Sequence, residues 1–111
     1  MTNQVKTVLI HGVFHFIGNK DSNFKGPVRR GFRPIIWLNE VTEGATSCSF
    51  ISDIEVYEGE YKKADIVILN ELQLNSPITK EVILNVGSTI HKIGEFEVLE
   101  NLGEWKGGKV P

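Results

Sequence analysis

The segment Val8-Leu9-Ile10-His11-Gly12-Val13-Phe14-His15-Phe16-Ile17 decides the fold of this chain. Its large apolar residues recur at every second position, which places Val8, Ile10, Phe14 and Phe16 on one face. A repeat of two residues is typical of a β-strand with one buried face. Gly12 lies where a bulge, or the close approach of another backbone, is expected. We therefore predict a long, bent strand over residues 8–17.

Further segments rich in β-forming residues follow at turn spacing, at residues 35–38, 46–51, 64–69, 81–86 and 89–99. Pro34 precedes the first of these segments and marks its start, because proline has no N–H to donate to a sheet ladder. Gly87-Ser88 predicts a hairpin between the last two segments. Four more residues are expected on buried alternate faces, namely Ile66, Ile68, Phe96 and Val98.

No segment shows the period of an amphipathic helix. Six short strands without a helix favour an antiparallel sandwich or a barrel, and closure into a barrel removes exposed sheet edges. We predict an all-β fold, a single closed or nearly closed antiparallel β-barrel of about six strands over residues 1–100. Residues 101–111 are rich in glycine and are predicted to form a C-terminal extension or tail, with Leu102 and Trp105 available to dock it.

The composition is that of one globular domain. The chain has 111 residues, 41% of them hydrophobic, and its 12 Lys and Arg against 14 Asp and Glu leave a net charge of −2. This balance argues against DNA or an anionic membrane as the partner. Cys48 is the only cysteine, so there is no intramolecular disulfide, and we expect a reducing compartment, the cytoplasm. Residues 8–17, the longest apolar stretch, are too few for a membrane span and lack the flanks of a signal peptide.

The residues that carry chemistry do not form a recognisable catalytic or metal-binding pattern. His11 and His15 share a strand face, but the intervening backbone separates them by about 13 Å, too far to hold one ion. Asn19-Lys20-Asp21 lacks the spacing of a guanine-specificity motif, and Gly107-Gly108-Lys109 lacks the hydroxyl residue of a phosphate loop. We therefore predict no catalytic residue, no metal, no cofactor and no GTP binding.

A basic loop is the charge feature that stands above background. Residues 18–38 hold five Lys and Arg against Asp21 alone, a local charge of +4 that leaves −6 for the rest of the chain. Such a loop is either an interaction surface or a solvated segment whose charges pair with acidic residues elsewhere in the chain. Its aromatic residues are suited to stack on a base, to fill a partner's pocket or to join the core. The candidate partner-binding residues are Lys25, Arg29, Arg30, Phe32, Arg33 and Trp37.

The stretch Arg30-Gly31-Phe32-Arg33-Pro34-Ile35-Ile36-Trp37-Leu38 resembles Lys-Gly-Tyr-Arg-Pro-Gln-Phe-Tyr-Phe, near the start of the C-terminal domain of elongation factor Tu. Further along, Tyr57-Glu58-Gly59-Glu60 is similar to Met-Pro-Gly-Asp of that family, and Ser76-Pro77-Ile78 to His-Pro-Ile. The similarity runs in order over residues 5–100. The resemblance implies a six-stranded antiparallel barrel that is not an enzyme and that, in the family, helps to hold the T-stem of aminoacyl-tRNA.

Several polar groups of the family are replaced in this chain. The Arg-His before the loop proline falls on Phe24 and Lys25, and the Gln after Arg-Pro falls on Ile35. The GTPase domain of the family has no counterpart in these residues, so the resemblance does not carry GTP binding with it. We therefore expect a protein partner first, RNA or tRNA bound by the basic loop as the alternative, and a small-molecule enzyme that uses the barrel mouth as a third interpretation.

Overall fold

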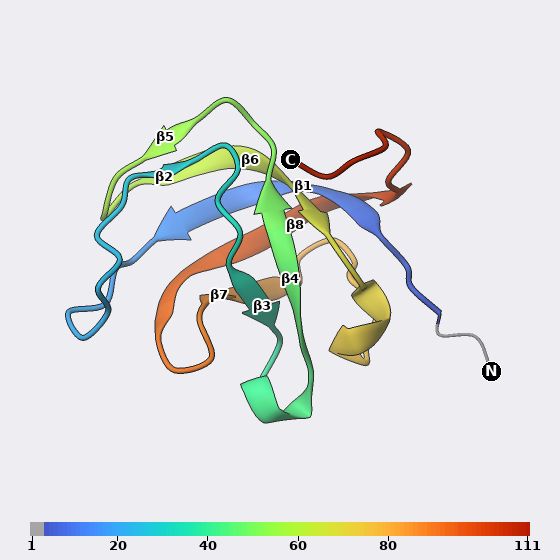
Figure 1. Ribbon diagram of the computed structural model, residues 1–111, viewed down its shortest axis with the longest axis horizontal. Helices are drawn as coiled ribbons and strands as arrows, with labels where there is room; N and C mark the ends of the chain where they lie inside the picture. The colour runs from blue at the N-terminus through green and yellow to red at the C-terminus, as the bar shows by residue number, and fades with distance from the viewer. Residues whose placement is uncertain (1–3) are drawn as a thin grey trace.

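A closed antiparallel barrel of six strands forms the body of the protein, as the computed structural model, which describes residues 4–111, shows (Figure 1). The strands follow one another around the barrel in the order β1-β6-β4-β3-β7-β8. The prediction of an all-β barrel is confirmed. The strands are β1 (Val8–Phe16), β3 (Ile35–Trp37), β4 (Ala45–Phe50), β6 (Tyr61–Ile68), β7 (Ile83–Gly87) and β8 (Lys92–Glu104).

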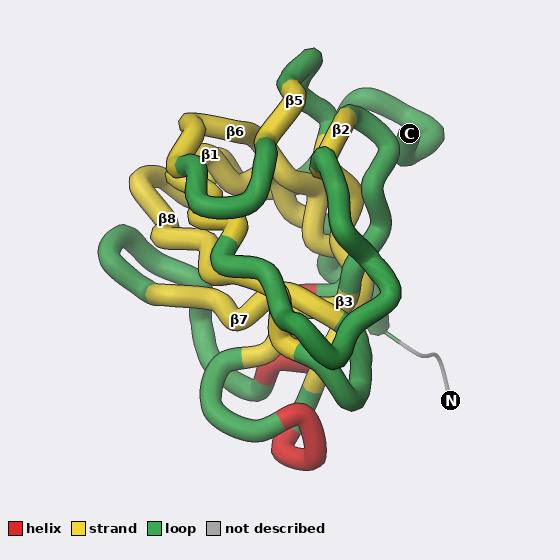
Figure 2. Tube along the Cα trace, turned by 90° about the vertical axis from the view of Figure 1, so that its left-hand side faces the viewer, coloured by secondary structure: helices red, strands yellow, loops and turns green. Residues whose placement is uncertain are grey.

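A two-stranded ribbon lies over one end of the barrel, made by β2 (Val28–Arg29) and β5 (Glu55–Val56) (Figures 1 and 2). Val28 and Val56 are fully buried and belong to the core, so the ribbon packs on the barrel interior and covers it. Two short 3-10 helices, η1 (Val41–Glu43) and η2 (Glu71–Leu74), complete the described elements. Within residues 4–111 no helix is long and apolar enough to cross a membrane.

Buried and partly exposed residues alternate along β1, and the buried ones form part of the core. All eight residues expected on buried faces are exposed by no more than 1%: Val8, Ile10, Phe14, Phe16, Ile66, Ile68, Phe96 and Val98. Phe14 packs edge to face on Phe50 with ring centroids 4.9 Å apart, and Phe50 packs in the same way on Phe96 at 6.3 Å. Edge-to-face contacts of this kind stabilise a core beyond the area that they bury.

β1 and β8 approach each other closely at Gly12. The register between the two strands shifts between His11 and Gly12, where β8 rather than β1 holds the extra residue, Leu99. A Cβ atom on Gly12 would lie 2.2 Å from the carbonyl oxygen of Glu97 and 2.3 Å from the ring of Phe96. Only glycine therefore fits between the backbone of β8 and the Phe96 ring.

The last strand is longer than the sequence predicts. β8 runs to Glu104, four residues past the expected end of the barrel at residue 100, and the Trp105 N–H donates to the Thr7 carbonyl at 2.9 Å. Glycine makes the extension possible, because Gly103 adopts φ +85° within the paired strand. The hairpin before β8 is present, but its loop spans residues 88–91 rather than two residues.

We predict that Phe14→Ala lowers the free energy of unfolding by about 3–5 kcal/mol, because a large ring is lost from the centre of the core. Chemical denaturation followed by circular dichroism measures this change. Ile90→Ala is the control, since Ile90 is 79% exposed and its truncation is expected to change stability by less than about 0.5 kcal/mol. A loss below about 1 kcal/mol for Phe14→Ala would contradict this core.

Gly12→Ala is expected to destabilise the protein by about 1–3 kcal/mol or more, because the added methyl group meets a backbone oxygen that cannot rotate away. Gly59→Ala is the comparison that separates steric overlap from backbone strain. At Gly59 the added atom meets nothing within 4 Å, but φ is +93°, so only strain is introduced. The two unfolding free energies are compared, and a smaller loss for Gly12→Ala than for Gly59→Ala would exclude the close approach.

Candidate functional site

The basic loop presents its cations at the end of the barrel that the β2–β5 ribbon covers (Figure 2). We use the name basic surface for four of its exposed cationic residues, Lys25, Arg29, Arg30 and Arg33. The ring of Phe24 stacks on that of Phe32 at 4.7 Å, which holds the segment of Lys25 beside the turn that carries the three arginines.

Backbone hydrogen bonds fix the turn that presents Arg30. The Gly31 N–H donates to the Phe50 carbonyl at 2.7 Å, and the Phe50 N–H donates to the Phe32 carbonyl at 3.0 Å. The Phe32 N–H closes the turn on the Arg29 carbonyl at 3.0 Å. Gly31 adopts φ +90°, which an L side chain rarely does. The turn is thus anchored to β4, and Arg30 stands on a rigid backbone.

Arg29 is already paired within the protein. Its Nε lies 3.0 Å from the Glu55 carboxylate across the ribbon, and the Tyr57 hydroxyl donates to the same carboxylate. The hydrogen bond from Tyr57, followed by the Arg29 charge, holds the pKa of Glu55 below its usual range, and the bond raises the pKa of Tyr57. Arg30 and Lys25, by contrast, have no carboxylate within 4 Å among residues 4–111.

Arg33 binds the C-terminal segment of the chain. Its guanidinium donates to the Val110 carbonyl at 2.8 Å and to the Pro111 carbonyl at 2.8 and 3.0 Å. The Ser49 hydroxyl donates to the same Pro111 oxygen at 2.6 Å. Figure 1 shows this segment returning from the end of β8 across the barrel. The last two residues of the segment predicted to form a tail therefore lie against the basic surface.

The two aromatic candidates lie apart from each other. Phe32 is half-buried between Phe24 and Phe50, so its ring belongs to the aromatic cover of the barrel end rather than to an exposed patch. Trp37 is only 7% exposed and lies at the other end of β3, where it lines a hollow together with residues 39–42 and 88–92. The structure thus brings the basic residues together and separates Trp37 from them.

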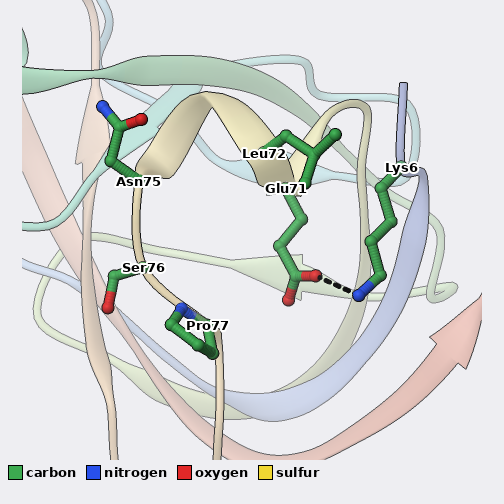
Figure 3. A pocket seen from close by; sticks show the side chains of 6 residues that line it. All are labelled: Lys6, Glu71, Leu72, Asn75, Ser76 and Pro77. Atoms are coloured by element: carbon green, nitrogen blue, oxygen red, sulfur yellow. Dashed lines mark ion pairs between the residues drawn. The ribbon is translucent and has the colours of Figure 1, made fainter. Parts of the chain in front are cut away.

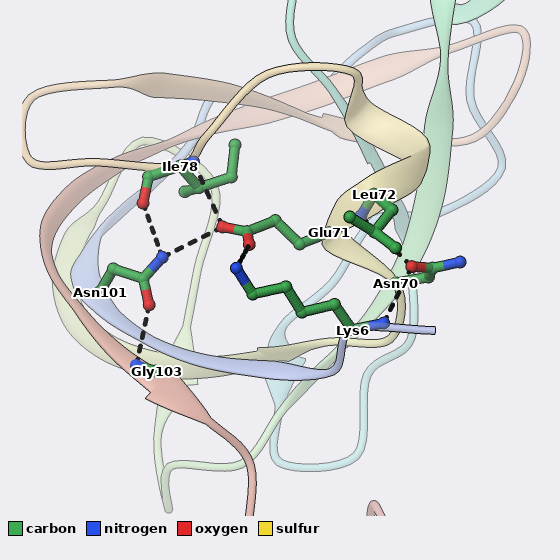
Figure 4. Close-up of polar contacts among 7 residues, drawn as sticks. All are labelled: Lys6, Asn70, Glu71, Leu72, Ile78, Asn101 and Gly103. Atoms are coloured by element: carbon green, nitrogen blue, oxygen red, sulfur yellow. Dashed lines mark hydrogen bonds and ion pairs between the residues drawn. The ribbon is translucent and has the colours of Figure 1, made fainter. Parts of the chain in front are cut away.

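A cavity of about 260 Å³ opens between η2 and the segment before β1, with Lys6, Glu71 and Pro77 among its walls (Figure 3). Glu71 is buried, and its carboxylate accepts hydrogen bonds from the Ile78 N–H at 3.2 Å and the Asn101 amide at 3.1 Å. Lys6 completes the set with an ion pair at 3.2 Å (Figure 4). Both oxygens of the Glu71 carboxylate therefore have partners, and this network links η2 to β8.

Two residues with nucleophilic or metal-ligating side chains, His11 and Cys48, illustrate how the fold holds such groups. His11 Nδ1 lies 2.6 Å from the Asp65 carboxylate on the outer wall. Cys48 is fully buried, and burial raises the pKa of its thiol well above the usual value. Among residues 4–111 no group of three His, Cys, Asp or Glu side chains is arranged to hold a metal ion.

Sequence reasoning missed a hollow on the barrel wall, which we call the outer groove. It has a volume of about 190 Å³ and takes its lining from four strands: Val13, His15, Tyr61, Ile83, Glu95 and Glu97. The period of two does place these side chains on outward faces. Their meeting depends on the register of β1 with both β6 and β8, for which the sequence holds no signal.

We predict that Arg33→Gln or Ser49→Ala releases the C-terminal segment, because each removes donors from the Pro111 carbonyl. Trypsin cleavage after Lys109 is then expected to become several-fold faster, as followed by mass spectrometry. Lys25→Gln is the matched control, since it removes a charge of the basic surface that does not contact residues 110–111. Cleavage of both variants at the wild-type rate would show that these hydrogen bonds do not hold the segment.

Comparison with known proteins supplies no relative for this chain. No protein-family model matches the sequence, and no curated protein matches it either. The resemblance to the C-terminal domain of elongation factor Tu therefore stays a prediction.

Proposed function

We propose that the protein is a non-catalytic binding module that docks on another protein through the basic surface. The observation that carries the proposal is Arg30, a cation without an ion-pair partner among residues 4–111, held on a turn that makes two backbone hydrogen bonds with Phe50 of β4. Arginines on rigid backbones dominate the energy of many protein interfaces, because little freedom is lost when the partner binds.

The surroundings of the turn support a protein rather than RNA as the ligand. Glu55 neutralises Arg29, and the side chain of Arg33 is engaged by backbone carbonyls, so two of the three arginines of the loop already have partners within the protein. Binding to RNA draws on several phosphate contacts at once. A single free arginine beside polar and paired groups fits a mixed protein surface that places one carboxylate opposite Arg30.

The aromatic cover of the barrel end supports a binding role over a catalytic one. Phe24 and Phe32 stack across this mouth and join the Phe50 ring, so side chains occupy the space that a substrate would need there. Two side chains that could act as nucleophiles are not available there, because the Cys48 thiol is buried and the Ser49 hydroxyl donates a hydrogen bond to Pro111. The resemblance to a domain that binds macromolecules and has no catalytic role agrees with this proposal.

The test compares capture of partners from the source cell by the wild-type protein and by Arg30→Ala. We expect a specific protein partner whose dissociation constant rises about 30-fold in the variant, which corresponds to about 2 kcal/mol at an interface centre. Lys80→Ala combined with Lys106→Ala removes exposed cations elsewhere and is expected to bind like the wild type.

Two outcomes would overturn the proposal. One is a partner that the folded Arg30→Ala variant binds as tightly as the wild type. The other is binding of tRNA or single-stranded RNA at low salt that weakens steeply as salt is added, because this dependence marks contacts to phosphates. Circular dichroism of each variant establishes that it is folded.

A further inference from the structure

The outer groove is built from two rows of side chains that cross the wall of the barrel. In one row His15 of β1 is paired with Tyr61 of β6 on one side and with Glu95 of β8 on the other. In the next row Glu97 of β8 is flanked by Val13 and Ile83. An aromatic pair, two carboxylates and two aliphatic side chains therefore share one hollow of about 190 Å³.

The aromatic side of the groove is exposed and fixed in place. Tyr61 is 66% exposed, and its ring stacks on that of His15 with centroids 3.8 Å apart and planes inclined by 12°. Ile83, opposite Glu97, is 51% exposed. The negative face of an aromatic ring attracts a cation placed over it, and the attraction strengthens as water is excluded.

The acidic side of the groove includes a carboxylate without an ion-pair partner among residues 4–111. Glu95 forms an ion pair with Lys92 at 2.7 Å, whereas Glu97 is exposed and has no ion-pair partner within 4 Å among residues 4–111. The two carboxylates project from the same face of β8, two positions apart, which spaces them by about 7 Å. A planar cation with several N–H donors is suited to reach them while it stacks on a ring.

We propose that the outer groove binds an arginine side chain of a partner protein. The guanidinium packs against the His15–Tyr61 pair and donates to the Glu97 carboxylate, and its aliphatic stem lies along Val13 and Ile83. An exposed cation–π contact and a surface ion pair are each weak, so the groove supplies one anchor within a larger protein contact rather than a site for a free small molecule. This surface is opposite in charge to the basic surface, and the inference does not depend on the proposed function.

The experiment titrates the ¹⁵N-labelled protein with the peptide acetyl-Gly-Ser-Arg-Ser-Gly-amide and follows the amide resonances. We expect saturable shifts at residues of β1, β6, β7 and β8 that line the groove. The same peptide with citrulline keeps the planar shape without the charge and is expected to bind at least about 5-fold more weakly, and the lysine peptide also more weakly.

Variants of the protein assign the contacts. Glu97→Gln and Tyr61→Ala are expected to weaken binding of the arginine peptide by about 5-fold each, whereas Tyr61→Phe keeps the ring and the affinity. Lys92→Gln is expected to strengthen binding, because it frees the Glu95 carboxylate and removes a nearby positive charge. Glu100→Gln and Tyr57→Ala change an exposed acid and an exposed aromatic outside the groove and are expected to have no effect.

The proposal is overturned if the citrulline peptide binds as well as the arginine peptide, if the shifts lie outside the groove, or if no saturable shift occurs at tens of millimolar peptide. Sedimentation of the protein alone provides a further check. Self-association that Glu97→Gln abolishes would assign the groove to a second copy of this chain and would exclude a different protein as its occupant.

Discussion

The contact of Gly12 with the Phe96 ring and the Glu97 carbonyl is the constraint on which the rest of the barrel depends. It brings together the two longest paired strands, β1 and β8, on which Phe14 and Phe96 are partners and both pack edge to face on Phe50. The bulge opposite Gly12, where β8 holds one residue more than β1, bends β8, and a bent strand is what allows a six-stranded sheet to close on itself. In the closed sheet the inward-facing side chains form the core, and the outward-facing side chains are available for binding.

The inner and outer faces of β1 show how one strand serves both purposes. Phe14 and Phe16 point into the core, and the residues that alternate with them, Val13 and His15, form one wall of the outer groove. At its ribbon end the barrel is covered by stacked phenylalanines, and the same stack holds the turn that carries Arg30. The two surfaces of opposite charge are therefore both rigid, because each rests directly on the core.

The sequence predicts the fold far better than the surfaces. The alternation from Val8 to Phe16 carries enough information to place the core, because burial on one face leaves a period of two. The extension of β8 to Glu104 leaves no such trace, since Gly103 interrupts the apolar pattern and bonds through its backbone. The resemblance to elongation factor Tu predicts the same barrel, but the barrel alone does not establish that relationship.

The candidate sites depend on pairings between residues that are distant in the sequence. Residues 18–38 carry a net charge of +4. The sequence does not show, however, that Glu55 forms an ion pair with Arg29, because the pairing of β2 with β5 brings these two residues together. The Tyr61–His15 stack likewise requires the register of β6 on β1. A period of two tells which face a side chain occupies but not which neighbour it meets, so the basic residues could be predicted and their partners could not.

The position of Pro111 governs how the protein should be tethered. Because the Pro111 carbonyl is held by Arg33 and Ser49, a fusion partner or a solid support attached after this residue begins beside the basic surface and shields it. An attachment that precedes residue 4 starts instead from the side of η2, where the Lys6 N–H donates to the Asn70 side chain. Attachment on the N-terminal side therefore leaves the contacts of Arg33 and Ser49 undisturbed, whereas attachment after Pro111 begins directly at them.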